Sequence, residues 1–244
     1  MAFGEEHRKG RQMKEKPEQK KEAKSKRAVV EIAPPRYDDL VVEIFGVSDL
    51  IQEHFSTKAR KAIEDKHQGK ATAPREIRDP SAEYEALKYR LPDGRDAMKS
   101  AAFQESCIFT APTLPGLYKT TVKSAIRVLD FLIPIQSYEV RGKKIIRRTE
   151  ANVRMVTDEG KDANGGFRIM YRPYYANWRV LVRIRFRPDL MTAEQIVNLL
   201  NHSGFSSGVG AHRPSSPKKS GPFGMFTTSE AQLLRALESA EKTA

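Results

Sequence analysis

The chain has 244 residues, enough for one sizeable domain or two small ones, and its single cysteine excludes an internal disulfide and fits a reducing compartment. No apolar run approaches the roughly 18 residues of a membrane span, and the charged N-terminus lacks the apolar core of a secretory signal, so we expect a cytoplasmic protein. The formal net charge of +12 favours a partner with negative charge, nucleic acid first among them, although a basic tail on an ordinary soluble protein would also explain it.

The N-terminal part is predicted to be a disordered basic tail over 1–28, followed by a single domain over 29–244. The tail consists mostly of Lys, Arg and Glu, and buries too little apolar surface to offset its ordering entropy. A strand is expected at 40–47, and a helix should follow from Ser48, which would be its N-cap. From about 69 to 99 the chain is charged and interrupted by Pro and Gly, which predicts an insertion with a short helix at 81–90.

The middle of the chain is predicted to continue with a helix and more extended segments. Apolar side chains between Leu117 and Leu132 recur roughly at helical spacing, and Pro115 lies near the start. Extended chain is expected at 132–140, a basic strand at 143–156, and a turn or flexible loop at 158–166. Cys107 lies in an apolar run, so we expect a buried side chain rather than a nucleophile.

The clearest strand spans 177–188. Apolar residues from Trp178 to Phe186 alternate with a series from Arg179 to Arg187, and this period of two predicts a sheet with one buried face. A helix should follow, because Thr192 and Gln195 form a capping box, and Gly204 is expected as its C-cap. A strand at 223–228 and a helix capped by Ser229 end the chain. This order predicts an α+β fold, a ferredoxin-like antiparallel sheet with helices on one face.

An arginine-rich strand face is the first candidate functional surface. Its side chains project from one side of the sheet about 6.6 Å apart, and their planar donors suit phosphate oxygens. The strand itself places no acid among them. Nucleic-acid contact is the favoured interpretation and an ordinary solvated face the alternative; the residues are Arg179, Arg183, Arg185 and Arg187.

A second basic stretch runs over 141–148. On a hairpin it would extend the same positive surface, although a hairpin tip kept soluble by lysine is also possible. Its basic residues are Arg141, Lys143, Lys144, Arg147 and Arg148. Aromatic residues interleave with charges just before the arginine-rich strand, where Tyr171, Tyr174 and Tyr175 are candidates for stacking on bases, while Trp178 belongs to the core.

A glycine-rich loop over 208–224 is the third candidate. Gly208 and Gly210 let the backbone pass close to a partner, and successive N–H groups could form an anion-binding nest. The loop matches neither a Walker motif nor a dinucleotide fingerprint, so no cofactor is expected. No set of Asp, Glu, His or Cys has the spacing of a metal site. The loop's basic or potentially basic side chains are His212, Arg213, Lys218 and Lys219.

These features together resemble the C-terminal half of the RAMP superfamily, the RNA-recognition-motif-like proteins of CRISPR effector backbones and processing ribonucleases. The resemblance covers about residues 105–228, and its matching loop positions are Gly208, Gly210, Arg213, Gly221 and Gly224. The segment with Gly116 and Lys119 is similar to the one that precedes a core helix in Cas7-type backbone proteins. The ending is also similar to that of small phage proteins with the pattern GxGxxRP…GxFGxF.

The resemblance implies a non-catalytic protein that binds single-stranded RNA or DNA, with several copies along one strand. Two other functions remain open. RAMP-type ribonucleases use a His as general acid or base without a metal, and His212 lies in the corresponding loop beside Arg213 and Lys218. The third function is that of a structural or assembly protein, for example of a phage virion, whose basic face binds protein or packaged genome.

Overall fold

The computed structural model describes residues 33–55, 57–70, 78–161, 167–217 and 219–241. The chain divides into two compact units at Pro34, and every helix and strand described belongs to the second unit, from Pro35 to Ala244. The predicted tail over 1–28 and the candidate Lys218 lie outside the described residues.

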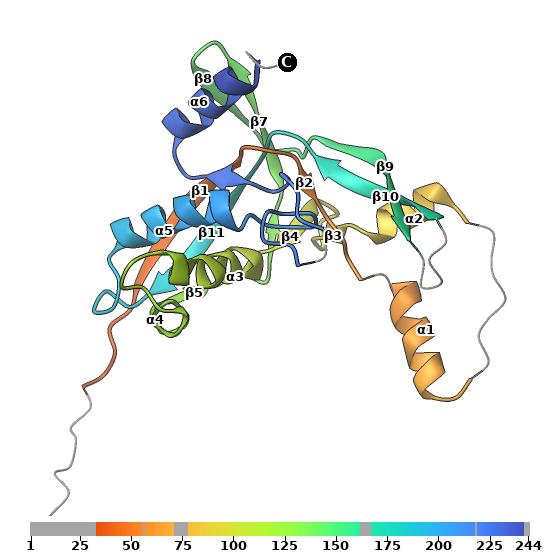
Figure 1. The fold of residues 1–244 in the computed structure, drawn as a ribbon, viewed down its shortest axis with the longest axis horizontal. Helices are drawn as coiled ribbons and strands as arrows, with labels where there is room; N and C mark the ends of the chain where they lie inside the picture. The colour runs from red at the N-terminus through yellow and green to blue at the C-terminus, as the bar shows by residue number, and fades with distance from the viewer. Residues whose placement is uncertain (1–32, 56, 71–77, 162–166, 218, 242–244) are drawn as a thin grey trace, which may run out of the picture. The chain divides into compact units, whose positions relative to one another are not determined.

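The largest sheet has the strand order β12-β1-β11-β7-β8, and β5 also pairs with β11 (Figure 1). All of these pairings are antiparallel. β1 and β11 pair along their length, from Asp38 opposite Phe186 to Phe45 opposite Arg179. The strands are β1 (Asp38–Gly46), β5 (Ile126–Val128), β7 (Gln136–Arg141), β8 (Lys144–Arg148), β11 (Trp178–Phe186) and β12 (Phe226–Thr227).

Two smaller antiparallel sheets accompany the large one. The first has the order β2-β10-β9, with β2 (Leu50–Ile51), β9 (Val153–Lys161) and β10 (Phe167–Tyr175). The second has the order β3-β4-β6, with β3 (Tyr89–Arg90), β4 (Asp96–Lys99) and β6 (Leu132–Pro134). β3 and β4 come from the segment that was predicted as an insertion, and Met98 of β4 packs into the main hydrophobic core.

The helices in the described part are α1 (Thr57–His67), α2 (Pro80–Ala86), α3 (Ala101–Thr110), α4 (Lys119–Ala125), α5 (Ala193–Ser206) and α6 (Glu230–Glu241), with a short 3₁₀ turn η1 (Ala111–Thr113). None of these helices has the length and apolar character needed to cross a membrane. The protein is therefore an α+β fold with antiparallel sheets, as predicted.

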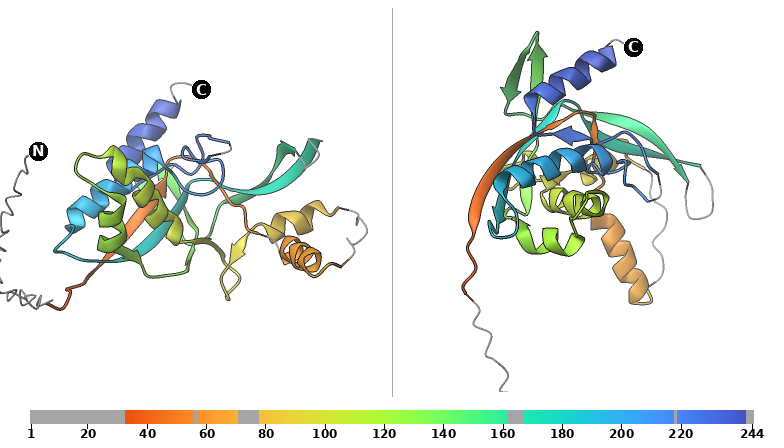
Figure 2. Two further views of the ribbon diagram at one scale, coloured as in Figure 1. Left: turned by 60° about the horizontal axis from the view of Figure 1, so that its bottom comes forward. Right: turned by 60° about the vertical axis from the view of Figure 1, so that its left-hand side comes forward.

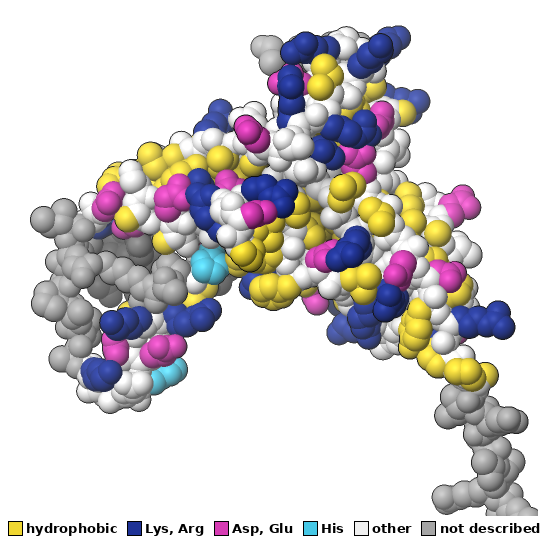
Figure 3. Space-filling model, turned by 180° about the vertical axis from the view of Figure 1, so that it is seen from behind, with side chains coloured by type: hydrophobic (Ala, Val, Ile, Leu, Met, Phe, Trp, Pro, Cys, Tyr) yellow, Lys and Arg dark blue, Asp and Glu magenta, His cyan; other side chains and the backbone are white. Residues whose placement is uncertain are grey.

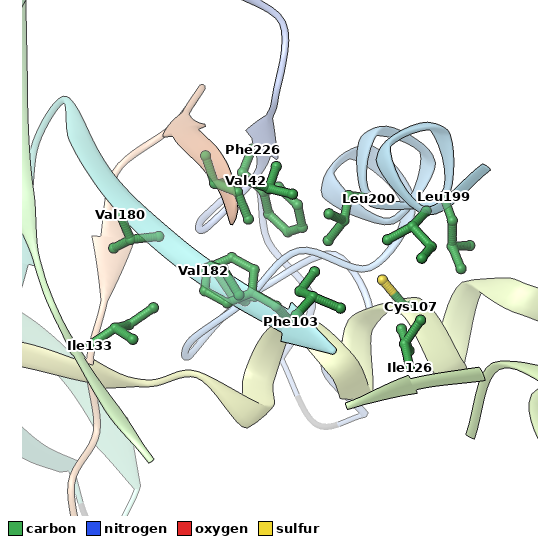
Figure 4. Close-up of a cluster of buried hydrophobic side chains, with 14 of the residues drawn as sticks. Val42, Phe103, Cys107, Ile126, Ile133, Val180, Val182, Leu199, Leu200 and Phe226 are labelled. Atoms are coloured by element: carbon green, nitrogen blue, oxygen red, sulfur yellow. The ribbon is translucent and has the colours of Figure 1, made fainter. Parts of the chain in front are cut away.

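The main core lies between the large sheet and helices α3 and α5, which pack side by side on one face of β1 and β11 (Figure 2). The alternation predicted for β11 is confirmed from Val180 to Phe186, where Val180, Val182, Ile184 and Phe186 are buried and Leu181, Arg183 and Arg185 on the other side are exposed. Arg179, predicted on the exposed face, is buried instead, because it forms an ion pair with Glu43 of β1. Figure 4 shows Val180 and Val182 of β11 in the same hydrophobic cluster as Phe103 of α3 and Leu200 of α5.

The N-cap predictions for the last two helices are confirmed. The Thr192 hydroxyl accepts a hydrogen bond from the Gln195 N–H at 3.2 Å, and Gln195 Oε1 accepts one from the Thr192 N–H at 2.9 Å. Ser229 Oγ accepts from the N–H of Gln232 at 3.3 Å at the start of α6. α6 packs through Leu233 against Phe45 and Tyr138, on the side of the sheet opposite the main core.

Several predicted boundaries are wrong because tertiary pairing overrides local periodicity. The helix expected through Leu132 ends at Ala125, since Ile126–Val128 pairs with β11 as β5. The helix expected from Ser48 begins only at Thr57, and Ser48 Oγ instead accepts from the N–H of Met225 at 3.0 Å. The predicted basic strand over 143–156 divides into β8 and β9, and part of the loop expected at 158–166 belongs to β9.

Gly204 does not cap α5. The helix continues to Ser206, and Ser207 is the C-cap. A side chain at Gly204 would place its Cβ 1.9 Å from the carbonyl oxygen of Phe226 in β12. The glycine is therefore required for close packing of α5 against β12 rather than for ending the helix.

Candidate nucleic-acid interface

The glycine-rich loop over 208–224 is fixed to the fold by backbone hydrogen bonds. Val209 N–H donates to the Gly224 carbonyl at 2.9 Å, Ala211 N–H to that of Ile51 at 2.9 Å, and Gly224 N–H to that of Asp49 at 2.8 Å. Gly208 N–H donates to the Ser203 carbonyl at 2.9 Å. These internal bonds occupy donors that the predicted anion nest would need, so an anion at this loop must be held mainly by side chains.

Two adjoining cavities flank the loop. The lysine cavity, of about 420 Å³, is bounded by α3, α4 and the loop, and its polar walls include Lys119, Lys123, Arg213, Ser207 and Ser215. The tyrosine cavity, of about 500 Å³, is bounded by the loop, β2 and the β3–β4 region, and its walls include Tyr89, Lys99, His212 and Lys219. The two cavities share Ala102, Gly210 and Arg213, so they meet along one wall.

The lysine cavity gathers three cations whose charges are not neutralised by an ion pair within the described residues: Lys119, Lys123 and Arg213. Lys119 and Lys123 lie four residues apart on α4, and therefore on one helix face. Arg213 is held in place by bonds from Nε to Ser215 Oγ and from Nη1 to the Gly210 carbonyl, both 3.0 Å. One carboxylate, Glu105, also lines the cavity.

The arginine-rich strand differs from the prediction, because neighbouring segments supply the acids that β11 itself lacks. Arg185 Nε lies 2.7 Å from Asp39 of β1, its register partner, and Arg183 Nε lies 2.9 Å from Asp130. The arginine hydrogen bonds lower the pKa of both carboxyl groups. The remaining two pairs are Arg179–Glu43 at 2.8 Å and Arg187–Asp189 at 3.2 Å.

Charges of both signs therefore alternate on this side of the protein. In the view from behind, basic and acidic side chains lie next to one another with apolar side chains between them (Figure 3). The exposed apolar residues of the sheet on this side include Val41 and Leu181. Each guanidinium is already bonded to a carboxylate, so a phosphate would have to compete with that partner.

The basic stretch over 141–148 forms the β7–β8 hairpin. Arg141 and Arg148 both pair with Glu139, at 3.3 and 2.8 Å. Arg147 binds Glu43 at 2.7 Å and also contacts Glu230 of α6. Lys143 and Lys144, next to the turn, are exposed and form no ion pair in the described part of the chain.

His212 lies in the tyrosine cavity within a cluster of charged groups. Its Nε2 is 3.3 Å from Asp158 Oδ2, and Lys219 Nζ is 3.3 Å from Asp158 Oδ1. Arg172, whose side chain is 4% exposed, reaches the same carboxylate at 3.0 Å. Burial lowers the pKa of His212, so its imidazole is neutral at neutral pH, and its Nε2 faces the Asp158 carboxylate.

No protein-family model matches the chain, and no curated protein sequence matches it. In the described residues, no three His, Cys, Asp or Glu side chains are grouped so that they could hold a metal ion. The candidate interface is therefore argued from geometry and charge.

The structure brings only some of the predicted residues together. Lys119, Gly208, Gly210 and Arg213 meet in the lysine cavity, and His212 and Lys219 join Gly210 and Arg213 in the tyrosine cavity. The arginine-rich strand and the β7–β8 hairpin line neither cavity. Tyr171 lines neither cavity, and the guanidinium carbon of Arg78 lies 5.9 Å from its ring centre.

Sequence reasoning missed four residues of the two cavities and the adjoining cluster. Lys123 could have been found, because it follows Lys119 by four residues inside a predicted helix. Lys99 and Tyr89 come from the segment taken as an insertion, and Asp158 from one taken as a turn. Nothing in the sequence signalled that these three lie beside the glycine-rich loop.

Proposed function

We propose that the protein binds single-stranded nucleic acid without catalysis, and that the lysine cavity holds a phosphate of the strand. The observation that carries the proposal is the group of three cations around one cavity that form no ion pair with any residue that the structure describes. Ser207 and Ser215 add hydroxyl groups that can donate to phosphate oxygens. Contacts of this kind bind the backbone and carry no base preference of their own.

The strand connectivity supports a ferredoxin-like, RAMP-type core for this function. In chain order, β1, α3, β5, β11, α5 and β12 give the sequence strand, helix, strand, strand, helix and strand. Other elements are inserted between β1 and α3, between α3 and β5, and, as strands β6 to β10, between β5 and β11. The four strands lie in the order β12-β1-β11-β5, all antiparallel. This strand order is compatible with the split βαβ arrangement of ferredoxin-like folds, which we propose for the core. Several copies along one strand are part of the same proposal.

The test removes the two cavity lysines and compares them with two lysines elsewhere. Lys119→Gln/Lys123→Gln should weaken binding of a labelled single strand roughly tenfold or more, because two charge-assisted contacts to phosphate are lost. The slope of log affinity against log salt should fall in magnitude by about 1.4. Fluorescence anisotropy over a salt series measures both quantities.

Lys143→Gln/Lys144→Gln is the matched control. It removes the same charge from two exposed lysines that line neither cavity, so it should change affinity much less. Equal losses in the two variants would mean that binding follows the total charge, and the cavity would then have no special role.

A second candidate function, metal-independent RNA cleavage, is favoured by the His212–Asp158 pair. Nε2 of His212 faces Asp158, and in the neutral tautomer that carries its proton on Nε2, Nδ1 can accept the proton of a ribose 2′-hydroxyl. The 2′-oxygen would then attack phosphorus and form a cyclic phosphate, and the 5′-oxygen would leave with a proton. Arg213 and Lys219 are close enough to the cavity to stabilise the phosphorane charge.

Incubation of RNA and of the matching DNA with a chelator tests this candidate. RNA alone should be cut, and His212→Asn should slow cutting by about a hundredfold or more. The rate should rise with pH to a plateau, and the midpoint of the rise should lie below the usual imidazole pKa. The rate rises with pH because His212 must be neutral to act as the base, and the midpoint is low because burial lowers the pKa of His212. Groups that share this environment are Asp158, Lys219, Arg172 and Glu53. Absence of cutting, or cutting by the variant at the parent rate, would eliminate the candidate.

A further inference from the structure

The tyrosine cavity has a different chemistry from the lysine cavity that it adjoins. Its apolar walls include Leu50, fully buried, Met98, which is 3% exposed, and Ala102. The aromatic ring of Tyr89 forms another wall, and polar side chains such as Lys99, His212 and Ser216 also contribute. A volume of about 500 Å³ lies within the range of small-molecule sites.

Tyr89 is held in position from several directions. Its ring packs edge-to-face on His54, with centroids 4.4 Å apart, and Lys99 Nζ lies 5.2 Å from the ring centre. Its backbone N–H donates to the buried Gln52 side chain at 3.5 Å. A ring fixed in this way offers a surface for a flat partner at little entropic cost.

The wall that the two cavities share places the anion-binding side chains next to the apolar and aromatic ones. Ala102, Gly210 and Arg213 line both cavities, and a group covalently joined to an anion in the lysine cavity can pass this wall into the tyrosine cavity. In a nucleic acid, the group joined to each phosphate is a nucleoside, whose base has flat apolar faces and polar edges. Apolar walls with an aromatic ring and polar side chains suit such a base.

We infer that the tyrosine cavity binds the base of the nucleotide whose phosphate occupies the lysine cavity. The inference rests on the proposed function and adds to it a contact with a base. The two cavities then form one nucleotide site, in which phosphate contacts supply the salt-dependent part of the affinity and the base contact supplies a part that salt affects little.

The experiment compares two short single strands with the same sugar–phosphate backbone, one bearing bases and one abasic at every position. Anisotropy titrations with the full chain should show the base-bearing strand binding roughly tenfold more tightly, the size of effect expected when a base stacks. Both strands should weaken as salt rises. Because the readout is a ratio within one protein sample, a partly unfolded preparation does not distort it.

Tyr89→Ala should reduce this ratio to within about twofold of one, whereas Phe131→Ala should leave it unchanged. Phe131 is a matched control, because it is exposed, lines neither cavity, and lies 6.0 Å from the same lysine, Lys99. Equal binding of the two strands by the parent protein, or an unchanged ratio in Tyr89→Ala, overturns the inference and leaves the phosphate site standing. If neither strand binds, both the inference and the proposed function are wrong.

Discussion

Gly224 shows at the residue scale how the glycine-rich loop is held. Its φ is 67°, a left-handed value that other residues adopt at a cost, and an added Cβ would lie 1.8 Å from the carbonyl oxygen of Val209. Val209 and Gly224 are also joined by a hydrogen bond from the Val209 N–H to the Gly224 carbonyl, and the Gly224 N–H donates to the Asp49 carbonyl. The loop therefore cannot accept a side chain at this position unless Gly224 and Val209 move apart.

Gly224→Ala should lower the free energy of unfolding by about 2 kcal/mol or more, since left-handed strain and overpacking combine. Gly94→Ala is the control, because Gly94 has a φ of 86° but open space around its Cβ position, so only the strain of about 1–2 kcal/mol applies. Urea titrations followed by circular dichroism measure both. If both variants lose the same free energy of unfolding, the close contact at Gly224 does not contribute to the loss.

Cys107 illustrates a residue whose role follows from its local sequence. Its side chain is buried against Ser203 of α5, with 3.6 Å between Sγ and Ser203 Oγ, and burial raises its pKa to about 12. The thiol is therefore protonated at neutral pH and a poor nucleophile. The apolar stretch around Cys107 predicts a buried side chain, and the structure confirms that the side chain is buried.

At the scale of elements, β11 shows that a regular pattern does not settle what a strand face binds. Arg183 and Arg185 are exposed, yet Asp130 and Asp39 each bind one of them through two hydrogen bonds. Exposed ion pairs of this kind add little stability, typically below about 1 kcal/mol. They do reduce the charge that remains available to a phosphate.

Arg183→Gln/Arg185→Gln should therefore weaken binding of a single strand less than Lys119→Gln/Lys123→Gln, although both variants remove two positive charges. The reason is that each arginine charge is already compensated by a carboxylate, whereas the cavity lysines form no ion pair among the residues for which the structure gives positions. Anisotropy titrations at one low salt concentration compare the two variants directly. A larger loss of affinity in the arginine variant would mean that the single strand binds to the β11 face rather than to the lysine cavity.

At the scale of the whole unit, the fold assembles the candidate site from distant parts of the chain. The tyrosine cavity combines β2, the β3–β4 region and the loop after α5, and the lysine cavity adds α3 and α4. Side chains that line the same cavity, such as Lys99 and Lys219, are thus more than a hundred residues apart along the chain. The formal charge of +12 favours an anionic partner, but the pairing of charges decides where that partner can bind.

The amino-acid sequence by itself determined the features that depend on neighbours along the chain. The alternation of β11, the Thr192 capping box, the terminal helix and the α+β class all follow from periodicity and capping, which act within a few residues. Local composition also indicated the glycine-rich loop as a candidate, and the resemblance to Cas7-type proteins indicated Lys119, but neither showed which cations are left without an ion pair among the described residues.

Only the tertiary structure decided which charges are neutralised and which meet in a cavity. Asp39 faces Arg185 across 146 residues of chain because β1 and β11 are antiparallel neighbours, and no local pattern encodes that register. In the same way Gly204 is required by the approach of β12, and Tyr89 and Lys99 reach the loop through the pairing of β3 with β4. Ion pairing and cavity formation act between elements, so they depend on strand order rather than on any single segment.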